Sequence, residues 1–197
     1  MNKIIMFFKK NKKSLYFIFT IALVGLAAGI CFYFFISYSD KTKCIDFINK
    51  YLNYIKNKKY FTLFLRSLIF NLIILVLIFI CAFSITGFFT STLVFFAKNF
   101  VTGLYITLIM KTTNYYTASI AYFLPSGFIY LLLFSIMLLF SLSISTNLIF
   151  SLFKGKTINF KNVSKKYLFV FLIIFGISFI FSLYEGFILP KILLNFI

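Results

Sequence analysis

The sequence predicts an all-α fold: a polytopic integral membrane bundle of about five transmembrane helices, with an amphipathic helix between the first two. Of its 197 residues, 62% are hydrophobic and only 3 are acidic, and the mean hydropathy is +1.05. Several apolar runs reach the roughly 20 residues that cross a hydrocarbon core of about 30 Å. A soluble domain of this length would need a far more polar surface, so we expect an integral membrane protein.

The first transmembrane helix is expected at residues 15–37, after a basic tail at 1–14. A basic segment before an apolar run is also typical of a secretory signal peptide. This run is longer than the apolar region of a signal peptide, and the bulky letters "CFYFF" follow the small "GLAAG". We therefore expect an uncleaved first span, in which Gly25 and Gly29 let another helix approach closely.

A polar segment at 38–67 separates the first two spans. Within it, Ile45, Ile48, Leu52 and Ile55 follow helical spacing, and Asp, Asn and Lys residues occupy the opposite face. This pattern predicts an amphipathic helix. Such a helix could lie on the membrane surface or dock against a partner protein, and the sequence is compatible with both.

Residues 68–197 are expected to form the rest of the bundle, about four further helices. The apolar tract at 68–110 is twice the length of one span, so a tight turn is expected at 86–92, where Gly, Ser and Thr gather. The tract at 118–153 is also too long for one span, and Pro125 is its natural break. The expected spans are 68–87, 91–110, 126–150 and 167–189, with a short interfacial or re-entrant piece at 118–124.

The orientation rests on the basic residues near the span ends, which are divided almost evenly between the two sides of the membrane. The basic N-terminal tail therefore decides, and it predicts a cytoplasmic N-terminus. With five spans, the C-terminus and the segment 38–67 then lie outside. The predicted localisation is the cell membrane, as a multi-pass protein.

The formal net charge of +17 raises the question of nucleic-acid binding. The Lys residues collect at the edges of apolar runs and do not form a basic domain with interleaved aromatic residues. Membrane lipids are therefore the expected partners, and no nucleic acid is expected.

Catalytic and metal-binding motifs are absent from the sequence. It has no His, its three Cys form no CxxC pair, and it has neither a GxSxG motif nor a phosphate-binding loop. We therefore expect no enzyme activity, no cofactor, no metal and no small-molecule substrate.

Glu185 is the only acidic residue after Asp46 and falls inside the last apolar run. A charged side chain at such a position normally faces a bundle interior or water and marks a functional or structural site. Ser178 and Ser182 precede it by seven and three residues, which places them on the same helical face. Two interpretations stay open: a structural clasp between helices, and a role in partner binding or gating.

Lys98 is the only charged residue inside the third span and would be the obvious partner of Glu185. Counted along the expected spans, however, the two residues sit at different depths. We therefore expect Glu185 near the outer interface, within reach of Arg66, Lys111 or Lys191. Lys98 is expected to extend to the cytoplasmic headgroups.

Four motifs in order resemble a known family. Arg66-Ser67 precedes Asn71, and the stretch "FSITGFFTSTLVFFAKNFVTG" follows. "YFLPSG" comes next, and "YEGFILPK" closes the last span. The order and spacing of these motifs over nearly the whole chain resemble the stage II sporulation protein M family of endospore-forming bacteria.

The resemblance implies a noncatalytic membrane scaffold. It would join two peptidoglycan-degrading sporulation proteins, stage II sporulation proteins D and P, at the septum, in the mother-cell septal or engulfing membrane. Wall removal there lets that membrane migrate around and engulf the forespore. The family-like or structural candidate residues are Asn71, Lys98, Gly103, Pro125, Glu185 and Pro190.

Two alternatives remain open. A transporter or channel component would use Glu185 and Lys98 as pathway residues, and an inverted sequence repeat, which we do not find, would favour it. A general membrane assembly factor of the wider family, unrelated to sporulation, is the other alternative.

Overall fold

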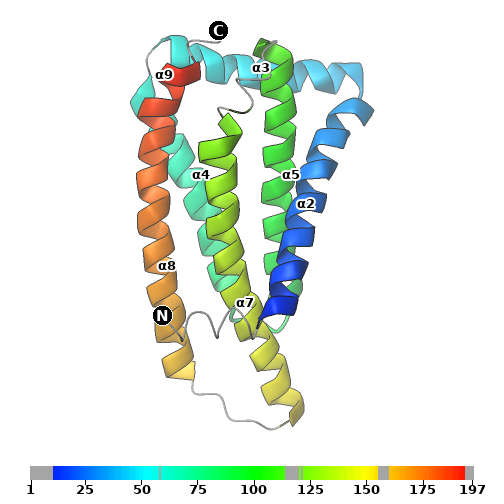
Figure 1. Ribbon diagram of the computed structural model, residues 1–197, viewed down its shortest axis with the longest axis vertical. Coiled ribbons are helices and arrows are strands. Elements are labelled where there is room, and N and C mark those ends of the chain that lie inside the picture. The colour runs from blue at the N-terminus through cyan, green and yellow to red at the C-terminus, as the bar shows by residue number, and fades with distance from the viewer. Residues whose placement is uncertain (1–10, 58, 114–119, 121, 155–159, 194–197) are drawn as a thin grey trace.

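The computed structural model describes residues 11–57, 59–113, 120, 122–154 and 160–193. In this part of the chain all regular structure is helical (Figure 1). The elements in chain order are α2 (Lys12–Phe35), α3 (Tyr38–Lys56), α4 (Tyr60–Cys81), α5 (Gly87–Thr113), η1 (Phe123–Phe128), α7 (Ile129–Lys154), α8 (Phe160–Leu183), η2 (Tyr184–Ile188) and α9 (Leu189–Leu193), of which η1 and η2 are short π-helical turns.

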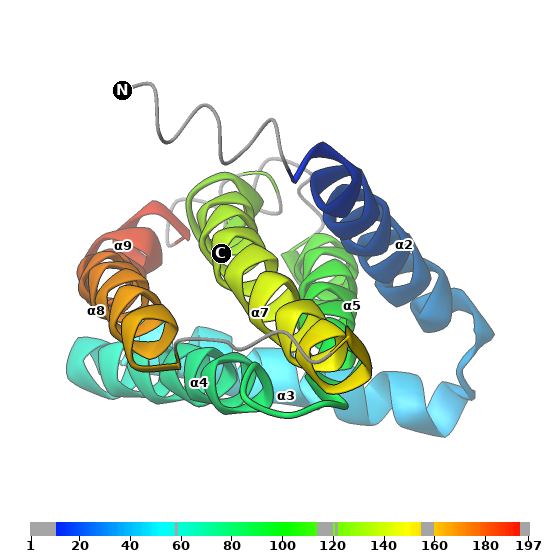
Figure 2. The same ribbon diagram turned by 90° about the horizontal axis from the view of Figure 1, so that it is seen from below.

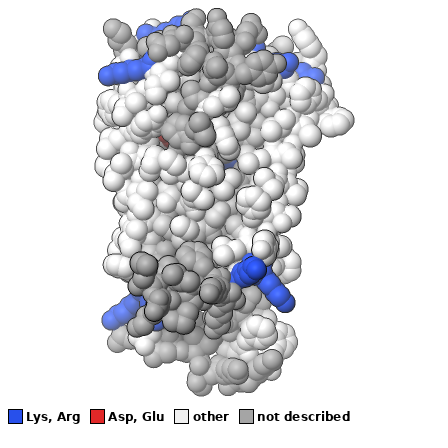
Figure 3. All heavy atoms as spheres, in the orientation of Figure 1, with Lys and Arg blue, Asp and Glu red and all other residues white. Residues whose placement is uncertain are grey.

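Five helices are long and apolar enough to cross a membrane, which confirms the predicted fold class. They run up and down in turn, so that α2 begins at one end of the bundle and α9 lies at the other (Figure 1). On the face that Figure 3 shows, Lys and Arg side chains gather at the two ends, and the wide band between them is almost free of charge. A hydrocarbon layer fits this band, so the chain is a multi-pass membrane protein.

Several helices begin earlier than the hydropathy predicted. α4 begins at Tyr60 and α8 at Phe160, each about two turns before its expected start. The turn before α5 covers residues 82–86, because α5 already begins at Gly87, so the predicted turn at 86–92 was placed too late. Hydropathy marks the part of a helix that lies in hydrocarbon, whereas helical hydrogen bonding continues into the polar residues beyond it.

The amphipathic helix α3 lies across the ends of the other helices (Figure 1). Ser37 caps its first turn by accepting a hydrogen bond from the Asp40 backbone amide, 3.3 Å away. The apolar face of α3 is buried, but against this chain's own bundle, so the predicted docking on membrane or partner was wrong for this face. The cluster consists of Ile48, Leu52, Ile55, Leu63, Leu108, Ile109, Leu189 and Leu193.

Glycines bring α2 and α5 together over their length. A Cβ atom on Gly25 would lie 3.0 Å from the Asn99 Cβ, and one on Gly29 would lie 2.9 Å from the Leu104 backbone nitrogen. From the other side, a Cβ on Gly103 would overlap the Leu26 carbonyl. The close approach predicted from "GLAAG" is thus confirmed, and Gly103 is its counterpart on α5.

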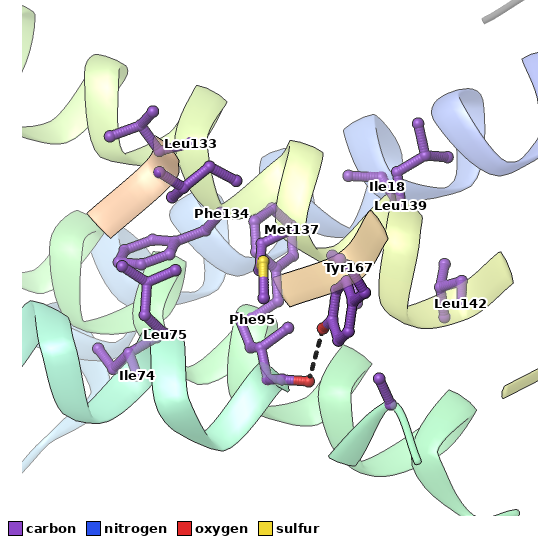
Figure 4. Packing of buried hydrophobic residues seen from close by; sticks show 14 of the residues in the cluster. Ile18, Ile74, Leu75, Phe95, Leu133, Phe134, Met137, Leu139, Leu142 and Tyr167 are labelled. Carbon is purple, nitrogen blue, oxygen red and sulfur yellow. Dashed lines mark hydrogen bonds between the residues drawn. The ribbon is translucent and has the colours of Figure 1, made fainter. Parts of the chain in front are cut away.

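The main core lies between α2, α4, α5 and α7 and is closed by Tyr167 of α8. Phe95, Phe134 and Met137 are almost fully buried and meet near its centre (Figure 4). The Tyr167 hydroxyl donates to the Ile78 carbonyl, 3.3 Å away (Figure 4). This bond satisfies a phenol that is only 1% exposed.

The expected piece at 118–124 lies largely outside the described residues. The structure places Pro125 in η1, directly before α7. The backbone stays helical through this proline and changes from a π-helical turn to a regular helix at Ile129, so the structure has a distortion of the helix here and not the predicted break.

Candidate functional site: a polar network and a charged cavity

Glu185 lies at the start of η2, where the last long helix loosens into a π-helical turn. Its carboxylate accepts a hydrogen bond from the Ser67 hydroxyl of α4. The Asn71 side-chain amide donates to the Ser67 carbonyl at 3.0 Å and lies 3.3 Å from the Ser67 hydroxyl. Glu185 is therefore tied to α4 through one serine that the asparagine holds in place.

The network continues into α7 through Tyr130. Its hydroxyl lies 3.0 Å from the Ser182 hydroxyl and 3.3 Å from the Ser178 carbonyl. Ser182 in turn lies 3.4 Å from the Ser67 hydroxyl. The polar network, which we define as Ser67, Asn71, Tyr130, Ser178, Ser182 and Glu185, thus joins α4, α7 and α8 with η2. Inside a membrane such bonds have no competing water, which supports the predicted clasp.

Close backbone packing brings the carboxylate to α4. A Cβ atom on Gly186 would lie 2.7 Å from the Cα of Phe64, so only glycine fits between η2 and α4 at this spacing. The side chain of Phe64 is also buried beside the ring of Phe179, with centroids 5.8 Å apart. Gly186, the residue directly after Glu185, therefore allows η2 to pack against α4.

Lys98 points into the bundle. Its ammonium nitrogen lies 4.9 Å from the centre of the Phe70 ring, 5.6 Å from that of Tyr130 and 5.8 Å from that of Phe134. Aromatic faces attract a cation, and the attraction grows when water is excluded. The predicted extension of Lys98 to the cytoplasmic headgroups was wrong.

Lys98 and Glu185 line the same cavity, of about 320 Å³, so the prediction that depth separates them was also wrong. The error came from counting along each span from its start. The lower end of α8 extends well beyond that of α5, so the two counts begin at different levels (Figure 1). Figure 2 shows the same helices from below, with α3 and α4 crossing at one side of the bundle.

Arg66 is the third charged residue of this cavity, and its guanidinium carbon lies 4.6 Å from the centre of the Phe47 ring of α3. Of the three cations predicted to be near Glu185, Arg66 therefore shares its cavity, whereas Lys111 and Lys191 are exposed and do not line it. The lining residues are Phe47, Tyr51, Leu63, Arg66, Ser67, Phe70, Asn71, Lys98, Val101, Thr102, Tyr105, Tyr122, Glu185 and Leu189.

The sequence model of stage II sporulation protein M matches residues 6–190. The chain belongs to the stage II sporulation protein M family. No curated protein and no solved structure matches it. Family membership makes the chain a sporulation-related membrane protein, and the match covers all five span-length helices almost completely.

In this member of the stage II sporulation protein M family, five of the six candidate residues fall into two groups, and Pro125 lies apart from both, in η1. Asn71, Lys98 and Glu185 meet at the cavity. Gly103 serves the contact between α2 and α5, and Pro190 is buried in α9. The structure therefore gives the first group a shared polar site and the second a packing role.

Sequence reasoning missed the three tyrosines of the cavity, Tyr51, Tyr105 and Tyr122. No sequence signal could have singled them out, because the chain contains 13 Tyr and 32 Phe. Among the described residues, no group of three or more His, Cys, Asp or Glu could hold a metal ion.

Proposed function

We propose that this protein is the noncatalytic membrane scaffold of a peptidoglycan-degrading complex that drives septal membrane migration and forespore engulfment. Its partners in this proposal are stage II sporulation proteins D and P. Family membership supports the sporulation context. The observation that supports a scaffold is the way α3 is held across one end of the bundle.

The outer face of α3 is a polar surface, and the packing of the inner face against the bundle holds the helix in place. Asp46, Asn49, Lys50 and Asn53 are exposed on it, while its inner face is packed into an apolar cluster. A helix fixed in this way presents its polar side chains without a large loss of conformational entropy when a partner binds. In the predicted orientation this surface lies outside the cytoplasmic membrane, where a wall-degrading partner would act.

Deletion of the gene tests the proposal. We expect asymmetric division to proceed and septal membrane migration to stop, as seen by membrane-dye microscopy. Normal engulfment in a deletion strain without a second copy would contradict the scaffold function. If the chain instead served as a general assembly factor, its loss would also disturb growing cells that do not sporulate.

A charge reversal on α3 tests the surface itself. Lys50→Glu should reduce recovery of the two partners with the scaffold while leaving its membrane abundance unchanged. Lys166→Glu, at another exposed lysine, near the start of α8, is the matched control and should leave recovery unchanged. Equal recovery with both variants would remove α3 as the docking surface.

A transporter or channel component is the second candidate, and one observation favours it. Lys98 and Glu185 carry opposite charges into a cavity among membrane-spanning helices, which is where pathway residues occur. Ion flux through the purified protein in sealed vesicles, lost in Glu185→Gln, would support this candidate over the scaffold.

A further inference from the structure

Some of the residues that line the charged cavity are exposed at the surface of the bundle. Phe47 of α3 and Phe70 of α4 line it and remain 40% and 46% exposed. Arg66, which lies over the Phe47 ring, is exposed as well. The rim therefore combines two aromatic rings with one cation, and the medium outside it is the membrane.

The depth of the rim matches the polar edge of a bilayer. Arg66 is six residues from the start of α4, about 9 Å below the end of the bundle that α3 covers. Headgroups and the interface occupy the outer several ångströms on each side of a hydrocarbon core of about 30 Å. A lipid headgroup could thus enter the cavity while its acyl chains stay in the hydrocarbon beside Phe70.

The lining favours an anionic guest. Lys98 and Arg66 bring two positive charges against the single negative charge of Glu185. Unbalanced charge among membrane helices is costly, and a phosphate with one negative charge would balance it. Burial raises the pKa of the phenols of Tyr51 and Tyr122, which lie outside the spans, so both remain protonated and can donate hydrogen bonds.

The side-chain oxygen of Asn71 is a buried hydrogen-bond acceptor that a donor group of a bound ligand could satisfy. The Asn71 side chain is only 3% exposed, and its oxygen has no hydrogen-bond partner, although its nitrogen is well bonded. Asn71 and Glu185 both bond to Ser67, and all three residues line the cavity. A hydroxyl group on the headgroup would satisfy it.

We propose that the cavity binds the headgroup of an anionic phospholipid that carries hydroxyl groups. The phosphate lies between Lys98 and Arg66, a headgroup hydroxyl donates to Asn71, and the acyl chains leave past Phe47 and Phe70. Phosphatidylglycerol has this chemistry. This proposal does not depend on the scaffold function, because its test measures lipid binding and not partner binding.

The test uses the full-length protein purified in a mild detergent and titrated with single lipids. Native mass spectrometry counts bound lipid, and thermal unfolding measures the shift that a ligand of the folded state produces. Phosphatidylglycerol should bind at least about tenfold more tightly than phosphatidylcholine, whose headgroup has no net charge and no hydroxyl. Glycerophosphoglycerol, the soluble headgroup without acyl chains, should bind far more weakly than the lipid.

Variants locate the site. Lys98→Met fills a similar volume among aromatic rings, and Arg66→Gln acts at the exposed rim; each should weaken phosphatidylglycerol binding about tenfold. Asn71→Leu should reduce the preference for phosphatidylglycerol over phosphatidate, which lacks the headgroup hydroxyls. Lys191→Met removes the same charge outside the cavity and should bind like the unaltered protein.

Four outcomes would overturn the proposal. Equal binding of phosphatidylcholine would show that the site does not select an anion. Equal binding of glycerophosphoglycerol would show that the guest is a soluble phosphate and not a membrane lipid. Absence of lipid binding, or equal binding by Lys98→Met and Lys191→Met when both unfold cooperatively, would show that the cavity is not the site.

Discussion

Substitution of Gly103 by alanine tests whether α2 and α5 are held by direct backbone contact. A Cβ atom there would overlap the Leu26 carbonyl oxygen and lie 3.1 Å from the carbonyl carbon. Both are backbone atoms, so no side-chain rotation can relieve the overlap. The helices must separate along part of their length, and overpacking of this kind costs about 1 to 3 kcal/mol.

Gly176 supplies the matched control. A Cβ atom at this position in α8 would meet nothing within 4 Å. Alanine in place of glycine inside a helix favours folding by roughly 0.5 to 1 kcal/mol, and this gain applies to both variants. The difference in stability between Gly103→Ala and Gly176→Ala therefore isolates the steric cost, about 1 to 3 kcal/mol.

The assay is denaturant-driven unfolding in detergent micelles, followed by the loss of helical circular dichroism. Gly103→Ala should unfold at a lower denaturant concentration than Gly176→Ala, and its abundance in the membrane fraction should fall. If the two variants unfold at the same midpoint, then α2 and α5 do not touch at Gly103, and the packing described for this pair is wrong.

Two further predictions concern Glu185 and the orientation. If Glu185 is a structural clasp, Glu185→Gln keeps most hydrogen bonds and is mild, whereas Glu185→Leu leaves the network unsatisfied at a cost of about 1 to 3 kcal/mol and lowers membrane abundance. An inactive but fully abundant Glu185→Gln protein would instead assign the function to the charge. For the orientation, a reporter active only in the cytoplasm should work at the N-terminus and fail at Ile197; the reverse result would contradict it.

The helices could be predicted from the sequence because a segment that crosses hydrocarbon must satisfy its own backbone hydrogen bonds as a helix, and such segments appear in the sequence as long apolar runs. The partner of an amphipathic face could not. The spacing of Ile48, Leu52 and Ile55 identifies an apolar face. The membrane, a partner protein or the chain's own bundle could each bury this face, and the spacing does not distinguish them. Only the fold brings Leu108 and Leu189 beneath it.

The cavity could not be predicted from the sequence for a related reason. Lys98 and Glu185 are each conspicuous in the sequence, and their charges suggested a pair. Their relative depth depends on how far each helix extends beyond the membrane, and hydropathy does not record that extension. Counting residues from the start of each predicted span therefore placed Lys98 and Glu185 at different depths, although the bundle brings both to one cavity.

The helix α3 is where the two proposals meet, and its two faces allow them to be separated. Its inner face contributes Phe47 and Tyr51 to the cavity, and its outer face exposes Lys50 and Asn53. A variant on the outer face changes what a partner protein meets but leaves the cavity lining intact. Lys50→Glu should therefore lower partner recovery without affecting phosphatidylglycerol binding. Loss of both together would mean that α3 undocks as a unit, because only movement of the whole helix connects its two faces.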